Sequence, residues 1–302
     1  MAFIKDLYRD EIRSGWIVTS DRKKVWNRQL EIWQELDRIC RKHDIIYWAG
    51  YGTLLGAARH GGFIPWDVDM DFCMMRPDFI RFCDVLDDEL IQSGNIFEPR
   101  LKSFIACVLS HSQTMAFYKE ELRKKTPYPN GLVIDIFPLD VAPDGTPDSS
   151  LATDVLIEFM DTMYDYPTLV RRVQSGGKTV NDWEVIDALY RLPDAKSKFK
   201  FVNVYATALF NQSSNVAWIQ NTMDKECDSF KKDFFRETVY LPFENVELPA
   251  PIDYENFLTA RYGDWRTPLN DGQNKIGFVH SADIPWRKFL AQVNLDLYLQ
   301  KK

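Results

Sequence analysis

Three aspartates alternate with apolar residues in the segment Asp67-Val68-Asp69-Met70-Asp71. Residues two positions apart on an extended strand point to the same side and lie about 6.6 Å apart, so the spacing predicts a row of carboxylates on one face. Such a row repels itself unless a cation neutralises it, and carboxylate oxygens are preferred ligands of Mg²⁺ and Mn²⁺. The segment therefore predicts a divalent-cation site beside a phosphate-bearing substrate; a solvated acidic face on an edge strand is the alternative. Apolar flanks such as Phe63 and Phe72 argue against full solvation.

A glycine-punctuated segment, from Gly52 to Gly62, lies just upstream of the aspartates. It predicts a strand end, a glycine turn and a short helical piece, whose backbone N–H groups would suit a pyrophosphate. It matches neither the P-loop pattern nor G-x-G-x-x-G, so a turn without any ligand is the alternative. The candidate nucleotide- and phosphate-binding residues are Gly52, Thr53, Gly56, Arg59 and His60. For Arg59, a structural ion pair with Asp67 or Asp140 is an equally good interpretation.

The elements that must position these residues follow from apolar periodicity. Residues 20–43 repeat apolar side chains at helical spacing and residues 45–49 are β-branched and aromatic, which predicts a long amphipathic helix and then a buried strand. The other expected strands are 68–74, 104–109, 115–118, 132–137, 239–241 and 246–248. The other expected helices are 77–90, 151–173, 183–192, 199–210, 254–261 and 286–299. Together they predict an α/β (α+β) fold, with a mixed sheet and flanking helices.

This pattern divides the chain into three parts. Residues 1–44 are an N-terminal helical segment packed on the core, residues 45–145 are the α/β core, and residues 146–302 are a mostly helical part. No internal repeat or low-complexity linker separates them, so we expect one compact unit.

Composition limits the partners and the location. The 302 residues are 45% hydrophobic, and 37 basic against 44 acidic residues give a net charge of −7, which argues against a dedicated nucleic-acid binder. The N-terminus lacks the apolar run of a signal peptide, and no stretch approaches the roughly 18 apolar residues that span a bilayer. We therefore expect a cytoplasmic protein with at most peripheral contact at the inner face of the membrane. Five widely spaced cysteines are expected to be buried thiols.

A dense resemblance joins these features. The stretch from Tyr47 to His60, continued from Gly62 to Asp71, resembles the signature of the LicD family, which comprises bacterial phosphocholine transferases and is related to fukutin and fukutin-related protein. A second block, Val133-Ile134-Asp135-Ile136-Phe137-Pro138-Leu139-Asp140, resembles the family's downstream D-I-F-P-L-D. A third, from Phe243-Glu244 to Tyr262-Gly263-Asp264-Trp265, resembles its C-terminal segment.

The resemblance implies a nucleotidyltransferase-type fold, in which a glycine turn on a helix, a D-x-D strand and a third carboxylate from a neighbouring strand meet. Carried over to this sequence, Asp69 and Asp71 are paired metal ligands and Asp135 is the third, with Mg²⁺ or Mn²⁺ as cofactor. Asp135 is alternatively the general base for the acceptor hydroxyl. Asp67 and Trp66 are expected to support the site.

Other residues have a functional and a structural interpretation. Tyr47, Trp48 and Tyr51 together predict a cage for a quaternary ammonium such as choline, with core packing as the alternative. Asp140 is expected to cap a turn. His111 and His280 are expected to be structural, and residues 262–264 are expected to end a helix, with substrate contact as the alternative.

The function implied is metal-dependent transfer of a phospho-alcohol, phosphocholine first, from CDP-choline or another CDP-alcohol to a hydroxyl of a cell-surface glycan or its lipid-linked precursor. Lipopolysaccharide or teichoic acid biosynthesis is the expected setting. CDP-ribitol and CDP-glycerol are alternative donors, because the motifs report phosphates and metals and not the group transferred. A nucleotidyltransferase that releases pyrophosphate and a D-x-D glycosyltransferase are alternative enzymes. A non-enzymatic scaffold is disfavoured, because all three aspartates are present.

Overall fold

The fold is described here from a computed structural model that covers residues 3–94, 96–118, 131–174, 183–219, 229–268 and 278–292. The α-helices are α1 Ser20–Lys42, α2 Tyr51–His60, α3 Arg76–Gln92, α5 Pro147–Gln174, α6 Trp183–Arg191, α7 Ala195–Leu209, α9 Tyr254–Tyr262 and α10 Trp286–Gln292. The strands are β1 Glu11–Arg13, β2 Trp16–Val18, β3 Trp48–Ala49, β4 Asp71–Met75, β5 Phe97–Lys102, β6 Cys107–His111, β7 Met115–Tyr118, β8 Val133–Ala142, β9 Asn215–Ala217, β10 Phe230–Lys231, β11 Thr238–Phe243, β12 Val246–Pro251 and β13 Phe278–Ser281. Short 3₁₀ turns lie at Phe210–Gln212 and Lys232–Phe235. Helices around a mixed sheet confirm the predicted α+β class.

The main sheet centres on the long strand β8. Within the described residues it has seven strands, in the order β10-β9-β8-β4-β3, with β6 also paired to β8 and β5 paired to β6. β4 and β8 run parallel, whereas β3 on β4, β6 on β8 and β9 on β8 are antiparallel. β8 is long enough to pair with β6 through its first residues and with β9 through its last, so it links the two halves of the sheet.

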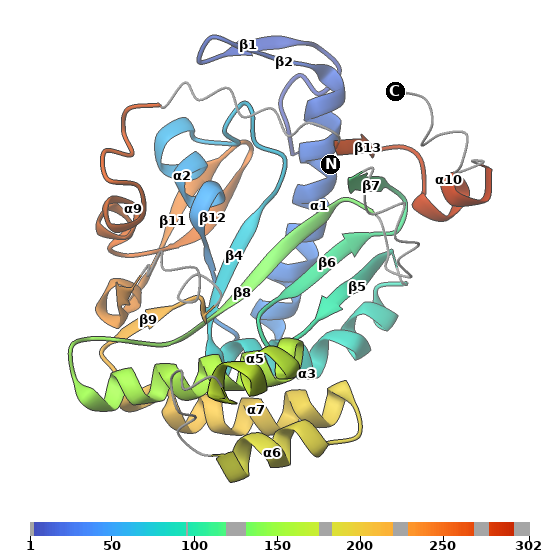
Figure 1. Cartoon of the computed structure of the whole chain (residues 1–302). Coiled ribbons are helices and arrows are strands. Elements are labelled where there is room, and N and C mark those ends of the chain that lie inside the picture. The colour runs from blue at the N-terminus through green and yellow to red at the C-terminus, as the bar shows by residue number, and fades with distance from the viewer. Residues whose placement is uncertain are drawn as a thin grey trace.

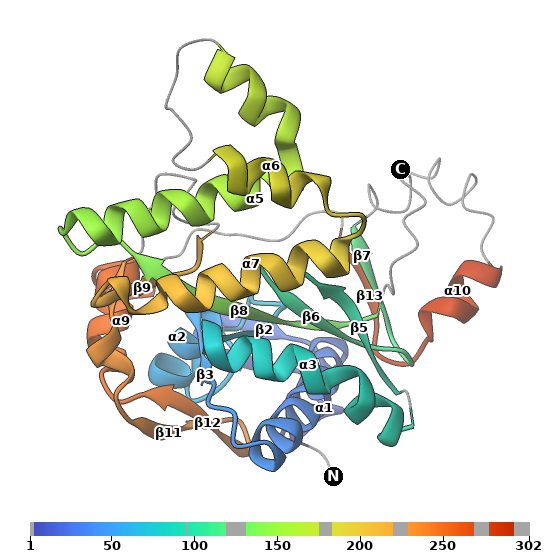
Figure 2. The same cartoon turned by 90° about the horizontal axis from the view of Figure 1, so that it is seen from below.

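Helices cover the sheet in two apolar clusters. α1 and α3 pack against β4 and β8 in the main core, where Leu36 and Phe82 join Phe72 and Ile136. α5, α6 and α7 form a second cluster around Val141, at the far end of β8. Figure 2 shows α5 and α6 on the opposite side of the sheet from α1, and Figure 1 shows α2 beside β4, with α9 on the far side of α2. None of the described helices is both long enough and apolar enough to cross a bilayer.

The helix predicted at 20–43 is confirmed as α1, and its ends follow from local chemistry. Thr19 caps the N-terminus by accepting a hydrogen bond from Arg22 N–H. Asp21 in the first turn and Lys42 in the last complement the helix dipole. The apolar stripe of α1, which includes the fully buried Trp26, faces the sheet and brings α1 against the segment that carries the aspartates.

Several boundaries differ from the prediction for local reasons. The strand expected at 45–49 is only Trp48–Ala49, because β3 pairs with just two residues of β4. The strand expected at 68–74 begins at Asp71, since residues 67–70 are outside the ladder. The strand expected at 104–109 is displaced to β6, and the polar strand β5 escapes the prediction. The expected helices agree within a few residues wherever they are described; residues 293–299 lie outside the described part.

The described cysteines, Cys40, Cys73, Cys83 and Cys107, are buried thiols, as expected. Cys227 lies outside the described residues.

Candidate active site

The carboxylates of β4 and β8 meet where these two strands pair. Asp71 and Asp135 are opposite each other in the parallel register, and Asp135 N–H donates to the carbonyl oxygen of Met70 at 2.9 Å. Register partners on neighbouring strands point to the same face of a sheet. The structure therefore brings these two aspartates together.

Asp67 and Asp69 precede β4 but keep its alternation. The side chains of Asp67, Asp69 and Asp71 are half-buried, whereas the residues between them are buried. An extended chain of period two thus carries the carboxylates past the start of the ladder. Asp135 lies on a half-buried face of β8 in the same way, so we refer to these four residues as the aspartate row.

The first turn of α2 holds the start of β4. Thr53 Oγ1 accepts a hydrogen bond from Asp71 N–H at 2.8 Å, and Gly50 N–H donates to the Asp71 carbonyl oxygen at 2.9 Å. A Cβ on Gly52 would lie 2.7 Å from Asp67 Oδ2 and 4.0 Å from Asp71 Oδ2, so a side chain at residue 52 would collide with the aspartate row. The expected short helical piece is confirmed as α2, but a turn at Gly52 is wrong, because Gly52 and Gly56 lie inside this helix. The positive dipole end of α2 is close to the row.

A clamp around Glu244 fixes the turn between α2 and the aspartate row. A Cβ on Gly56 would lie 2.5 Å from the Gly62 carbonyl oxygen, so glycine lets the chain fold back against α2. Glu244 Oε1 then accepts a hydrogen bond from Phe63 N–H at 3.1 Å. Arg13 on β1 binds both oxygens of the same carboxylate. The third sequence block and the N-terminal hairpin thus anchor the approach to Asp67.

Side chains of α1 hold the aspartate row from the other side. Trp26 Nε1 and Arg22 Nη1 both donate to the carbonyl oxygen of Asp67, at 3.1 and 3.2 Å. Gln29 Nε2 donates to the carbonyl oxygen of Val68 at 2.7 Å. These hydrogen bonds go to the backbone and position the row, and the positive charge of Arg22 also interacts with the carboxylate of Asp67.

Arg59 and His60 form a pair at the end of α2. Arg59 Nε donates to His60 Nε2 at 3.0 Å, and Arg59 Nη1 donates to the carbonyl oxygen of Trp265 at 2.9 Å. Burial, with Arg59 and Arg13 nearby, lowers the pKa of His60 to about 4, so the imidazole is neutral near pH 7. The alternative pairing of Arg59 with Asp140 is wrong, because Asp140 has another partner. Phosphate binding by Arg59 and His60 stays a prediction.

Trp66 joins the N-terminal hairpin to this end of α2. Its ring lies 5.1 Å from that of Trp16 on β2 and 6.3 Å from that of His60, measured between centroids. Ser14 Oγ lies 3.4 Å from His60 Nδ1. Trp66 therefore supports the site by packing, as expected of a supporting residue.

The three aromatic residues expected to form a choline cage lie in separate surroundings. Tyr47 is buried and donates its hydroxyl to Asp37, and Trp48 is buried and donates from Nε1 to Thr238. Tyr51 instead meets the rings of Phe137, Trp218 and Phe257. A cage of these three residues is wrong, because Tyr47 and Trp48 are core residues turned toward other elements.

The helix α9 delivers side chains that the sequence analysis left outside the chemistry. Arg261 Cζ lies 5.9 Å from the ring centroid of Tyr51 and 5.7 Å from that of Tyr262. Burial raises the pKa of the Tyr262 hydroxyl, and the carboxylates of Asp71 and Asp67 raise it further, which shows that the phenol lies near the aspartate row. The signal was the block at residues 262–264, which ends α9 as expected and directly follows Arg261.

Asp140 is a structural residue, but it is not a turn cap. Arg76 Nε donates to Asp140 Oδ1 at 2.7 Å and Arg76 Nη2 donates to Oδ2 at 2.5 Å, and neither side chain is exposed. The Arg76 guanidinium also lies 4.2 Å from the ring centroid of Phe104. The expected turn is absent here because β8 continues through Asp140 to Ala142.

His111 and His280, both expected to be structural, lie in different surroundings. His111 is buried and its Nε2 lies 3.2 Å from Glu31 Oε2, so it serves a polar network on α1. His280 is half-buried on β13, where burial lowers its pKa.

Comparison with known proteins covers the same region of the chain. Residues 44–167 match the family model described as LicD/FKTN/FKRP, nucleotidyltransferase domain. This segment is a LicD-family domain. The matched LicD segment contains α2, β4 and β8, and therefore the whole aspartate row.

Relatives of this chain come from bacteria and from animals. The lipopolysaccharide cholinephosphotransferase LicD of Haemophilus influenzae is 23% identical over 258 residues, which cover 84% of this chain and 95% of that protein. An uncharacterized protein of Rickettsia typhi is 41% identical over 256 residues, 84% of this chain and 63% of that protein. The ribitol 5-phosphate transferase FKRP of Homo sapiens is 41% identical over 54 residues, 18% of this chain and 10% of that protein.

Proposed function

We propose that the chain transfers a phospho-alcohol, phosphocholine first, from a CDP-linked donor to a hydroxyl group of a glycan. The observation that carries the proposal is the pairing of Asp71 with Asp135 across β4 and β8, within the segment that matches the LicD model. The names of two relatives, a cholinephosphotransferase and a ribitol 5-phosphate transferase, both describe transfer of a phospho-alcohol. The second name supports CDP-ribitol as the next donor to test.

The reaction forms one phosphorus–oxygen bond and breaks another. The acceptor hydroxyl oxygen attacks the phosphorus that carries the alcohol, and CMP leaves with the electrons of the broken bond. The hydroxyl proton passes to a base, for which we propose the carboxylate of Asp135, half-buried beside Asp71. The attacking hydroxyl oxygen and the leaving CMP oxygen must lie on opposite sides of the phosphorus.

The aspartate row suits a divalent cation. Asp67 Oδ2 and Asp71 Oδ2 lie 2.7 and 4.0 Å from the point that a Cβ on Gly52 would occupy, so two carboxylate oxygens lie close to the first turn of α2. Across the ranges that the structure describes, no three acidic, imidazole or thiol groups already surround an ion position, so a third ligand would arrive by side-chain rotation. We assign Asp69, Asp71 and Asp135 as the ligands of Mg²⁺ or Mn²⁺, which when bound polarises phosphoryl oxygens and lowers the pKa of an attacking hydroxyl.

The surrounding elements supply the donor's other contacts in this proposal. Arg261 lies over Tyr51 and near Tyr262, so its guanidinium is a cation beside the aspartate row that suits the donor's phosphates. Gly52 and Thr53 act through structure: glycine avoids a collision with the Asp67 carboxylate, and threonine fixes the backbone of β4.

Product analysis tests the proposal directly. Purified protein is incubated with Mg²⁺ or Mn²⁺ and with CDP-choline, CDP-ribitol, CDP-glycerol, CTP or UDP-glucose, with water as the acceptor. We expect CMP from one CDP-alcohol, loss of the signal with EDTA, and recovery with excess Mg²⁺. Pyrophosphate from CTP, or UDP from UDP-glucose, without CMP from any CDP-alcohol would contradict the proposal and identify a nucleotidyltransferase or a glycosyltransferase.

A further inference from the structure

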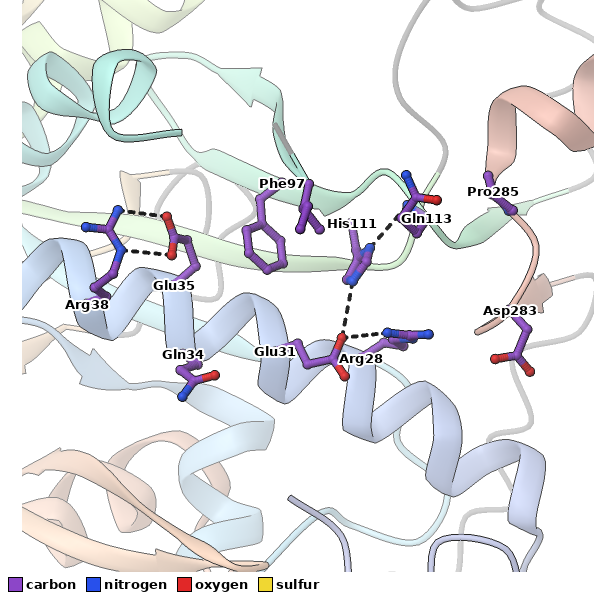
Figure 3. A pocket seen from close by; sticks show the side chains of 11 residues that line it. Arg28, Glu31, Gln34, Glu35, Arg38, Phe97, His111, Gln113, Asp283 and Pro285 are labelled. Atoms are coloured by element: carbon purple, nitrogen blue, oxygen red, sulfur yellow. Dashed lines mark hydrogen bonds and ion pairs between the residues drawn. The ribbon is translucent and has the colours of Figure 1, made fainter. Parts of the chain in front are cut away.

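A second cavity, of about 730 Å³, lies along α1 between the end of β6 and residues 283–285 (Figure 3). Figure 3 shows the ring of Phe97 between two polar groups, the Arg38–Glu35 pair on one side and a network of His111, Glu31 and Arg28 on the other. The aspartate row contributes no residue to its lining. The proposed reaction leaves this cavity unused.

Both polar groups are held in fixed, planar arrangements. Arg38 donates to both oxygens of Glu35, at 2.8 and 2.9 Å. Arg28 Nη1 donates to Glu31 Oε2 at 2.8 Å, and His111 Nε2 lies 3.2 Å from the same oxygen. The paired groups keep lone pairs and N–H groups that are available to a ligand. Because the pairs already fix these long side chains, binding costs less side-chain conformational entropy.

The charges of the lining favour a neutral ligand. Arg28 and Arg38 face three carboxylates, those of Glu31, Glu35 and Asp283. His111 Nδ1 accepts a hydrogen bond from the backbone N–H of residue 113, at 3.2 Å. A nucleotide or a free phosphate would bring negative charge to a lining that is already slightly acidic.

We infer that this cavity binds a neutral saccharide and is a subsite for the acceptor glycan, an inference that rests on the proposed function. A sugar ring has an apolar C–H face that fits against Phe97. Its hydroxyl groups both donate and accept, so they match carboxylates, guanidinium groups and the amides of Gln34 and Gln113.

The sheet connects the cavity to the aspartate row. Val108 on β6 is opposite Asp135 on β8, and His111 lies three residues further along β6, about 10 Å away and on the opposite face of the sheet. His111 N–H donates to the carbonyl oxygen of Leu132 at 2.9 Å, just before β8 begins. A glycan bound here would therefore reach the row by passing around the first residues of β8.

The test uses the full chain on a printed array of bacterial surface glycans. We expect binding to at least one uncharged glycan, weakened about tenfold by Gln34→Ala combined with Gln113→Ala, because each exposed amide supplies a hydrogen bond. Phe97→Ala should abolish binding, with melting curves recorded for every variant. Gln212→Ala, a change at an exposed glutamine of the 3₁₀ turn, is the matched control and should bind like the wild type.

The outcomes separate this inference from the proposed function. No array binding by a folded wild type, or binding that survives both Phe97→Ala and the double glutamine change, overturns the saccharide site. CMP release from the donor to water is measured in parallel on the wild type. Array binding without CMP release keeps the saccharide site and refutes the transferase proposal, whereas CMP release without array binding refutes the site alone.

Discussion

Two aspartates of β8, Asp135 and Asp140, lie on opposite faces of the same strand and in opposite electrostatic surroundings. Asp140 is fully buried and its charge is neutralised within the chain by both donor groups of Arg76. Asp135 is half-buried and lies opposite another carboxylate, that of Asp71. The first charge belongs to the structure, whereas the second is placed where a cation or a substrate can neutralise it.

Asp140 and Asp135 should also differ in their contribution to the free energy of unfolding. Breaking a buried ion pair leaves an uncompensated charge in the interior and typically costs about 3–5 kcal/mol of stability. Removing one member of a row of like charges relieves repulsion instead. Stability and turnover should therefore respond in opposite ways to changes at the two aspartates.

Asp71→Asn or Asp135→Asn should lower CMP release by about 10³-fold, because each change removes a proposed metal ligand or base. The melting temperature should stay level or rise, since the change removes like-charge repulsion. A quenched-flow or coupled assay measures turnover, and calorimetry measures the melting temperature. Turnover within tenfold of the wild type for both variants would remove the aspartates from the chemistry.

Asp140→Asn should lower the free energy of unfolding by about 3–5 kcal/mol, because Arg76 keeps its buried charge without a partner. Urea titration measures this loss. The double change Arg76→Met with Asp140→Leu should recover most of the stability, because no charge is left in the core. A loss below about 1 kcal/mol in the single variant would contradict the assignment of a buried pair.

Glu244→Ala should lower kcat about tenfold with little change in KM for the donor, because the clamp positions Asp67 and does not touch the donor. Glu244→Gln should restore part of kcat, since its amide oxygen can still accept from Phe63 N–H. Glu247→Ala, at an exposed position of β12, is the matched control. Equal kinetics for the two alanine variants would show that the clamp has no effect on the site.

The pH dependence of stability has a specific sign at His60. Its pKa is lowered from 6.5 to about 4 in the folded protein, so the unfolded chain takes up a proton that the folded chain refuses. Stability should therefore fall as the pH drops from 6.5 toward 4, and His60→Gln should make that fall shallower. Urea midpoints measured at several pH values test this, and an unchanged slope would refute it.

Much of the fold could be predicted from local sequence patterns. The apolar spacing of 20–43 and the alternation at 67–71 depend only on neighbours in the chain, and both appear in the structure. The pairing of Asp71 with Asp135 was approached through family resemblance, because a parallel register between distant strands leaves no local signal.

The features that could not be predicted from the sequence depend on contacts between distant residues. Gly52 looked like a turn residue, but it is a helical glycine that gives room to Asp67. Asp140 could not be assigned without Arg76, and the clamp at Glu244 needs Arg13 from the other end of the chain. In each case the sequence shows the residue type but not the distant residue that it contacts.

Mn²⁺ binding, followed by the loss of the free-ion signal in electron paramagnetic resonance, tests the central claim most directly. With CDP-choline present, the wild type and the Arg76→Met/Asp140→Leu variant should bind Mn²⁺, whereas Asp71→Asn and Asp135→Asn should lose that binding. Equal Mn²⁺ binding by Asp135→Asn, or no binding by the wild type, would contradict the assignment of the aspartate row as a metal-dependent transfer site.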